Sequence, residues 1–153
     1  MKKIASFQVN HDTLEKGMYI SRIDGDVVTY DIRMKKPNGG DYLSMSAAHT
    51  LEHLFATYAR NSEVAGGVIY VGPMGCRTGF YFLTRDTITH EQAIAVVRDS
   101  MVFARDFEGE IPGNKKEECG NYLDHDLAGA KAIGAKMYEV LKNWTVVDLA
   151  YKE

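Results

Sequence analysis

The sequence predicts an α+β fold in which an antiparallel β-sheet carries helices packed on one face. Two observations support this prediction. Residues 18–23 and 27–33 have strand-like composition and are joined by Asp24-Gly25-Asp26, a tight hairpin turn. Two long helical patterns follow in the second half of the chain, and strands joined by hairpins followed by long helices are typical of α+β layer folds. A chain of 153 residues suits one domain, spanning residues 1–153.

The first helix is expected over residues 46–60, after the chain break at 37–40 (Pro-Asn-Gly-Gly). This segment contains no glycine or proline, and Ser44 or Ser46 is a suitable N-cap.

Two further strands are expected at residues 68–71 and 80–84. Gly66-Gly67 precedes the first of them. A glycine-rich turn, residues 72–79, separates the two.

A second helix should begin after Thr89, which forms a capping box with Gln92, and should run to about Phe107. Its apolar residues recur at helical spacing and predict one buried face: Ala93, Val96, Val97, Met101 and Ala104.

The sequence Ile-Pro-Gly at 111–113 ends that helix, and a polar stretch follows it. Asp124 is the expected cap of a last helix over about 125–143. Residues 144–149 are expected to form a closing strand or an extended tail.

Charge and hydropathy argue against several kinds of partner. The formal net charge is −3 and the pI is near 6, which gives no reason to expect nucleic acid. No segment approaches the roughly 20 apolar residues that span a bilayer. Residues 1–12 lack the apolar core of a signal peptide, so we expect a cytoplasmic protein that binds neither nucleic acid nor membrane.

The most informative motif is H-T-L-E-H at residues 49–53, which has the H-x-x-E-H pattern. Residues four apart share a helix face, so His49 and His53 can direct imidazole nitrogens toward one metal ion. Glu52 would lie beside that ion, placed to act as a general base. A buried helix with satisfied histidines is the simpler alternative.

A catalytic metal site usually takes three protein ligands and leaves one position open. Cys119, in a polar loop before Gly120, is a candidate third ligand, and His125 and Glu118 are rivals on residue type alone. A thiolate ligand would favour a softer ion such as Fe(II), Zn(II) or Co(II).

Cys76 lies between Gly75 and Arg77 in the turn that follows the third strand. The neighbouring guanidinium would favour the reactive thiolate form at neutral pH. A partly buried, unreactive cysteine in a glycine-rich turn is the alternative.

Together these motifs resemble those of the S-ribosylhomocysteine lyase (LuxS-type, autoinducer-2 synthase) family. The resemblance rests on H-T-L-E-H at 49–53, P-M-G-C-R-T-G-F-Y at 73–81 and Cys119-Gly120, and it extends to Ser6-Phe7, His11, D-I-R at 31–33 and the start of the last helix. These motifs occur in the same order along nearly the whole chain. The resemblance implies a two-layer sandwich related to the inverse zincins.

By this resemblance, His49, His53 and Cys119 hold one Fe(II) per subunit, with zinc or cobalt as possible substitutes. The implied reaction cleaves the thioether of S-ribosylhomocysteine and yields homocysteine and 4,5-dihydroxypentane-2,3-dione, the autoinducer-2 precursor. Carbonyl migration must precede β-elimination, and the metal would act as a Lewis acid for both. Cys76 would move protons in the migrations and Glu52 in steps that include the elimination.

The resemblance also implies substrate contacts by Ser6, His11 and Arg33. Ser6 and His11 would come from the second subunit of a homodimer whose active site lies at the interface. Arg33 would either pair with the Cys76 thiolate or orient a substrate oxygen. Many family members carry Asp and Ser where this chain has Tyr70 and Gly72, so those contacts are expected to differ here.

Two other functions fit the H-x-x-E-H motif. An inverse-zincin metallopeptidase would use Glu52 as a general base and a downstream carboxylate as third ligand, and it would leave Cys76 without a task. A non-enzymatic metal-binding protein would have a closed four-ligand site. The block at residues 73–79 argues against both, and the lyase is the expected function.

Overall fold

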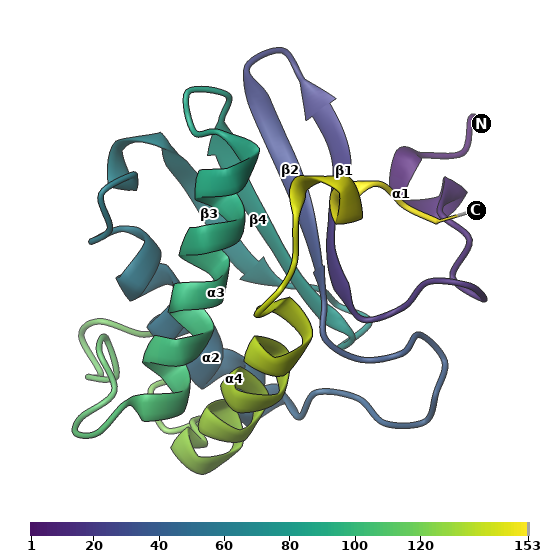
Figure 1. The fold of residues 1–153 in the computed structure, drawn as a ribbon. Coiled ribbons are helices and arrows are strands. Elements are labelled where there is room, and N and C mark those ends of the chain that lie inside the picture. Colours follow the sequence, from purple (N-terminus) through teal and green to yellow (C-terminus); the bar gives the residue numbers. More distant parts are fainter. Residues whose placement is uncertain (153) are drawn as a thin grey trace.

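The computed structural model describes residues 1–152 and contains a four-stranded antiparallel sheet with strand order β1-β2-β4-β3 (Figure 1). This confirms the predicted α+β class. The strands are β1 (Gly17–Asp24), β2 (Val27–Arg33), β3 (Val68–Pro73) and β4 (Gly79–Arg85). The helices are α1 (Ala5–Gln8), α2 (Met45–Ala59), α3 (His90–Asp106) and α4 (Leu127–Leu141), with 3-10 segments η1 (Ala65–Gly67) and η2 (Val146–Leu149).

Strand β2 occupies the centre of the sheet, between β1 and β4. The β1–β2 hairpin turns at Gly25, whose φ of 59° belongs to the left-handed region that glycine adopts without strain. Strand β4 pairs with β2 along its whole length, from Val27 opposite Arg85 to Arg33 opposite Gly79. The ends of β2 and β4 are therefore fixed side by side, and Cys76 lies in the turn that precedes β4.

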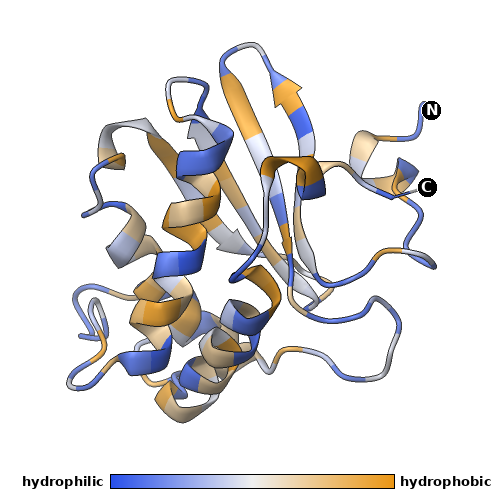
Figure 2. Ribbon diagram, in the orientation of Figure 1, coloured by the Kyte–Doolittle hydropathy of each residue, from blue (hydrophilic) through white to orange (hydrophobic). Residues whose placement is uncertain are grey.

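Helices α2, α3 and α4 lie together on one side of the sheet (Figure 1). Alternate residues of β2 point into this layer, where Val28, Tyr30 and Ile32 are buried. In Figure 2 the central strands and parts of the helices are orange, which marks this apolar layer. No helix within residues 1–152 is long and apolar enough to cross a membrane.

Two of the three long helices have the N-cap residue that the sequence predicted. The Ser44 hydroxyl accepts a hydrogen bond from the Ala47 N–H, and Thr89 forms the predicted capping box with Gln92. The cap of α4 is Asp126, whose carboxylate accepts a hydrogen bond from the Gly129 N–H. The prediction that Asp124 caps this helix was wrong, and α4 begins two residues later than expected.

The expectation of a strand or extended tail at residues 144–149 was also wrong. Residues Val146–Leu149 form the 3-10 segment η2, which begins with a capping box between Thr145 and Asp148. Both the backbone N–H and the hydroxyl of Thr145 donate to the Asp148 carboxylate. Val146 and Val147 favour a strand, but the local hydrogen bonds between Thr145 and Asp148 favour the 3-10 turn that is observed.

Gly134 allows α4 to approach α3 closely. A Cβ at this position would lie 2.8 Å from the Met101 carbonyl oxygen and 3.0 Å from the Ala104 Cβ.

We expect Gly134→Ala to destabilise the fold by about 1–3 kcal/mol through overpacking, despite the better helix propensity of alanine. Urea unfolding measures this change, and Gly66→Ala, where a Cβ meets nothing within 4 Å, is the control expected to stay within about 0.5 kcal/mol of the parent. A stabilising Gly134→Ala would contradict the packing argument.

Candidate metal centre

The H-x-x-E-H segment lies on α2, on a face adjacent to the buried one. Leu51, Leu54 and Phe55 are buried in the core, whereas His49 and His53 are partly exposed. Their rings lie 4.7 Å apart between centroids, at an interplanar angle of 88°. The helix thus holds the two imidazoles together while its other side anchors it in the core.

Each of these imidazoles is oriented by a backbone carbonyl from the segment between α3 and α4. His49 Nδ1 lies 2.7 Å from the Asp124 oxygen, and His53 Nδ1 lies 2.8 Å from the Pro112 oxygen. A carbonyl accepts only, so each Nδ1 carries the proton and each Nε2 keeps a free lone pair. Metal-binding histidines are usually fixed in this way.

A glycine lets the loop pass this close to His53. Gly113 has a φ of 73°, and a Cβ there would lie 3.2 Å from His53 Nδ1. A residue with a side chain would be strained at this φ and would crowd the ring.

The same loop brings Cys119 to the two free Nε2 atoms. Its sulfur lies 3.4 Å from His49 Nε2 and 4.0 Å from His53 Nε2. One donor atom from each of His49, His53, Cys119 and His125 can be chosen so that all lie within 4.8 Å of one another. Imidazole and thiolate donors at these separations fit a transition-metal ion such as zinc or iron.

His125 is the fourth member of this cluster. Its ring stacks on His49 at 4.0 Å between centroids, and its Nδ1 lies 2.9 Å from the Thr50 hydroxyl. Its Nε2 is buried without a hydrogen-bond partner among residues 1–152. Burial, followed by the charges of His49 and His53, holds the pKa of His125 below its usual value. The rival Glu118 is not in the cluster, and its carboxylate instead accepts from the Lys115 N–H.

Glu52 lines two hollows that flank the cluster. One, of about 570 Å³, also has His49, Gly75 and Arg77 in its wall, so it extends from the cluster to the residues on either side of Cys76. The other, of about 380 Å³, includes His53. Glu52 therefore borders open space beside the cluster that is large enough for a small molecule.

Cys76 is exposed at the tip of the turn between β3 and β4. The turn is closed by hydrogen bonds from the Arg77 N–H to the Met74 oxygen and from the Met74 N–H to the Gly79 oxygen. Arg77 has a φ of 62°, a left-handed conformation that costs a non-glycine residue about 1–2 kcal/mol. This strained turn presents the thiol to solvent.

A buried ion pair lies behind Cys76. Arg33 makes two hydrogen bonds to Asp31, at 3.0 and 2.7 Å, and both residues are at most 3% exposed. Arg33 also donates to the Thr78 hydroxyl at 2.7 Å and lies 4.0 Å from the Cys76 sulfur, which is 3.0 Å from that hydroxyl. Burial acts to lower the pKa of Arg33, but the hydrogen bonds and charge of Asp31 outweigh it, and the net shift is upward.

Ser6 and His11 do not join this group. Ser6 lies on α1, which Figure 1 shows beyond β1, apart from α2. His11 follows α1, and its Nδ1 lies 2.8 Å from the Val9 carbonyl oxygen. The described chain therefore brings together six of the eight predicted site residues around one region: His49, Glu52, His53, Cys119, Cys76 and Arg33.

Tyr70 and Gly72 form a complementary pair on β3. A Cβ at position 72 would lie 2.5 Å from two ring carbons of Tyr70, so the ring fits only over glycine. Tyr70 also lines the smaller hollow beside Glu52 and His53. The two departures from the expected family residues are thus structurally coupled.

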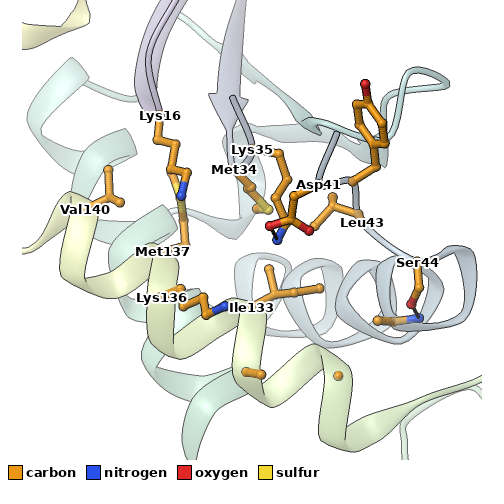
Figure 3. Close-up of a pocket in the computed structure, with 14 residues that line it drawn as sticks. Lys16, Met34, Lys35, Asp41, Leu43, Ser44, Ile133, Lys136, Met137 and Val140 are labelled. Carbon is orange, nitrogen blue, oxygen red and sulfur yellow. Dashed lines mark hydrogen bonds and ion pairs between the residues drawn. The ribbon is translucent and has the colours of Figure 1, made fainter. Parts of the chain in front are cut away.

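A separate hollow of about 240 Å³ lies between the segment leading into α2 and the helix α4 (Figure 3). Lys16, Lys35 and Lys136 reach into it, and Lys35 pairs with Asp41 at 2.9 Å. It contains no member of the metal cluster, so it does not form part of the candidate centre.

An H-x-x-E-H helix with a cysteine from a separate loop defines this protein as one with a candidate His/Cys metal centre in an α+β fold. A family model described as S-ribosylhomocysteinase (LuxS) matches residues 4–147. The chain belongs to this family.

Relatives named S-ribosylhomocysteine lyase are similar over their whole length. The protein from Clostridium acetobutylicum is 46% identical, with 100% of both chains covered. The protein from Phocaeicola vulgatus is 45% identical, covering 99% of this chain and 98% of its own. That from Porphyromonas gingivalis is 44% identical over 100% of both.

Several supporting groups could not be assigned from sequence. Thr50 accepts a hydrogen bond from the Asp126 N–H, which ties α2 to the start of α4. The bond between His53 and the Pro112 carbonyl involves a backbone group, so no residue type in the sequence indicates it. Tyr151, whose hydroxyl reaches Asp31, is separated from it by 120 residues. Thr50 and Thr78 lie within the motifs at 49–53 and 73–81, but the motifs themselves indicate no role for either hydroxyl.

We expect metal-stripped protein to gain stability when Zn²⁺ is added, because the donors converge only in the folded state. The gain should reach about 2.7 kcal/mol at a free Zn²⁺ concentration 100 times Kd. Thermal unfolding with and without Zn²⁺ measures it. His53→Ala should lose most of the gain, whereas the control His11→Ala, outside the cluster, should keep it. Equal stabilisation of both variants would contradict the assignment of this centre.

Proposed function

We propose that this chain is an S-ribosylhomocysteine lyase, which cleaves the thioether of its substrate to give homocysteine and 4,5-dihydroxypentane-2,3-dione, the autoinducer-2 precursor. The observation that supports this most strongly is the hollow of about 570 Å³. His49 and Glu52 lie in its wall, as do Gly75 and Arg77, the neighbours of the exposed Cys76. Thioether elimination needs a Lewis acid and acid–base groups around one small substrate, and this family member places candidates for both there.

In this proposal His49, His53 and Cys119 hold one metal ion per subunit, Fe(II) in the native enzyme, with zinc or cobalt as substitutes. The bound metal would supply a Lewis acid for the carbonyl and hydroxyl oxygens of the substrate. The neutral tautomers imposed by Asp124 and Pro112 suit this ligand set. His125 would support His49 by stacking, which leaves three ligands and one open position.

Cys76 would act as the base and acid that moves protons between adjacent carbons of the ribose chain while the carbonyl migrates. A thiolate is the form that takes up a proton, and the guanidinium of Arg33 lies 4.0 Å from the Cys76 sulfur. Arg33 would thus serve the thiolate, with contact to a substrate oxygen as the alternative role. The exposed position of Cys76 at the turn gives it access to the substrate.

Glu52 would act in proton transfers that include the elimination. In that step, a proton leaves the carbon next to the carbonyl, the C–S bond breaks, and the sulfur takes up a proton to leave as the homocysteine thiol. Glu52 lines both hollows beside the cluster, so its carboxylate reaches the space where the substrate would lie. A peptidase would need no thiol opposite Glu52, and neither the family nor its relatives support that alternative.

We further propose that the enzyme is a cytoplasmic homodimer whose partner supplies Ser6 and His11. Both cysteines are free, as expected in a reducing compartment. Ile4 and Phe7, at α1, are large apolar side chains that are 54% and 65% exposed. Exposed apolar side chains of this kind are available for an interface, and Figure 1 shows α1 beyond β1, apart from α2.

The lyase activity is tested by free thiol released from S-ribosylhomocysteine under anaerobic conditions, with metal content recorded. Cys76→Ala should keep its metal yet lose turnover by at least about 100-fold, the usual contribution of a general acid–base group. His53→Ala should lose the metal together with activity. Full turnover by metal-loaded Cys76→Ala would refute the mechanism, and peptide cleavage without thiol release would favour the peptidase.

The shared site is tested by mixing two inactive variants, Cys76→Ala and His11→Ala, under conditions where subunits exchange. If His11 serves the partner's site, each mixed dimer has one site with both changes and one intact site. Random mixing should then restore about a quarter of the parental activity. A mixture as inactive as its components, with exchange verified, would contradict a shared site.

A further inference from the structure

The face of the sheet opposite helices α2, α3 and α4 carries a buried ion pair, Asp31–Arg33. Asp31 and Arg33 alternate along β2 with the core residues Tyr30 and Ile32, so they point away from the helices. Both are nevertheless at most 3% exposed. Other residues must therefore shield the pair from water on this face.

Tyr151, near the end of the chain, is one of these residues. Its hydroxyl donates to Asp31 Oδ2 at 2.7 Å, and its ring stacks on Tyr19 at 5.0 Å between centroids and 21° between planes. Burial, followed by the negative charge of Asp31, raises the pKa of Tyr151, which keeps the phenol protonated near pH 7.

The contacts continue from Asp31 to the thiol at the tip of the turn. Asp31 holds Arg33 at two points, Arg33 donates to the Thr78 hydroxyl, and that hydroxyl lies 3.0 Å from the Cys76 sulfur. An unbroken series of polar contacts thus links the C-terminal segment to Cys76.

We propose that Tyr151 is a positioning residue for Cys76, because its hydroxyl fixes the Asp31 carboxylate that in turn holds the Arg33 guanidinium beside the sulfur. Asp31 offsets part of the positive charge of Arg33. A hydrogen bond donated to Asp31 partly neutralises the negative charge of its carboxylate. The carboxylate then offsets less of the positive charge of Arg33, and the electrostatic attraction between the guanidinium and the thiolate is stronger. The inference rests on the proposed function in its assignment of Cys76 as the proton-transfer group.

Charged and titratable groups lie near Cys76 on several elements, and Glu52 and Asp124 line the hollow that reaches Gly75 and Arg77. Arg33 approaches from β2, the phenol of Tyr81 lies nearby on β4, and Arg77 is the next residue in the turn. Burial raises the pKa of Tyr81, which keeps that phenol neutral near pH 7. Among these groups, Arg33 is the cation that Tyr151 can influence, because both bond the Asp31 carboxylate.

The test measures how fast iodoacetamide alkylates Cys76 in zinc-loaded protein, with the modified residue assigned by peptide mass spectrometry. At pH 7, Tyr151→Phe should react about fivefold more slowly than the parent, because less of the thiol is ionised. At pH 9.5, where free thiols are largely ionised, the two rates should converge. If Tyr151→Phe instead blocked access to Cys76, its rate would stay lower at both pH values. Convergence at pH 9.5 therefore indicates that the variant lost stabilisation of the thiolate.

Two further variants keep the result interpretable. Tyr19→Phe removes a neighbouring hydroxyl that bonds the Glu15 carbonyl and not Asp31, so its rate should match the parent. Tyr151→His restores an N–H donor and should recover at least half of the parental rate at pH 7. Thermal unfolding and zinc content confirm that each variant is folded.

Two results would overturn the proposal: folded Tyr151→Phe reacting at the parental rate at pH 7, or reacting more slowly by the same factor at both pH values. Alkylation does not require turnover. A parent protein that releases no thiol from S-ribosylhomocysteine, yet shows the expected alkylation pattern, would refute the proposed function and leave the role of Tyr151 in Cys76 reactivity standing.

Discussion

The candidate centre depends on two hydrogen bonds that tie the segment between α3 and α4 to the imidazoles of α2. His53 bonds the Pro112 carbonyl and His49 bonds the Asp124 carbonyl, across 59 and 75 residues of chain. These bonds select the tautomer of each ring, and they hold the long loop against the helix. Cys119 lies between the two anchor points, so its sulfur is delivered to the free Nε2 atoms as a consequence.

A second constraint acts on the other wall of the site. Burying Asp31 and Arg33 costs several kcal/mol of desolvation for each charge, which only close pairing and further hydrogen bonds can offset. Thr78 and Tyr151 provide those bonds. Because Thr78 belongs to the turn that carries Cys76, the same network that satisfies the buried pair also fixes the turn. Stability of the sheet and placement of the thiol are therefore linked.

Local patterns in the sequence were sufficient to predict the hairpin at Gly25, the four strands and the helix that carries His49 and His53. Periodicity and turn chemistry act over a few residues, and these elements obey them. The errors occurred where two local signals compete. Asp124 and Asp126 can both cap a helix, and the valines at 146 and 147 favour a strand while Thr145 and Asp148 form a capping box.

The long-range parts of the site could not be predicted from residue patterns. Spacing alone left Cys119 as the candidate third ligand with His125 and Glu118 as rivals, because nothing local indicates how a loop folds back on a helix. The resemblance to the lyase family singled out Cys119, and the structure places both Cys119 and His125 in the cluster. Tyr151 had no signal, since its partner Asp31 is 120 residues away.

The central claim is that the ion is held by two imidazoles and one thiolate, with a position left for substrate. X-ray absorption spectroscopy of the zinc-loaded protein tests this most directly. We expect one sulfur neighbour at about 2.3 Å and two imidazole nitrogens at about 2.0–2.1 Å, with a further light-atom neighbour that changes when S-ribosylhomocysteine is added. A spectrum without sulfur, or one with three imidazoles that stays the same on adding substrate, would contradict it.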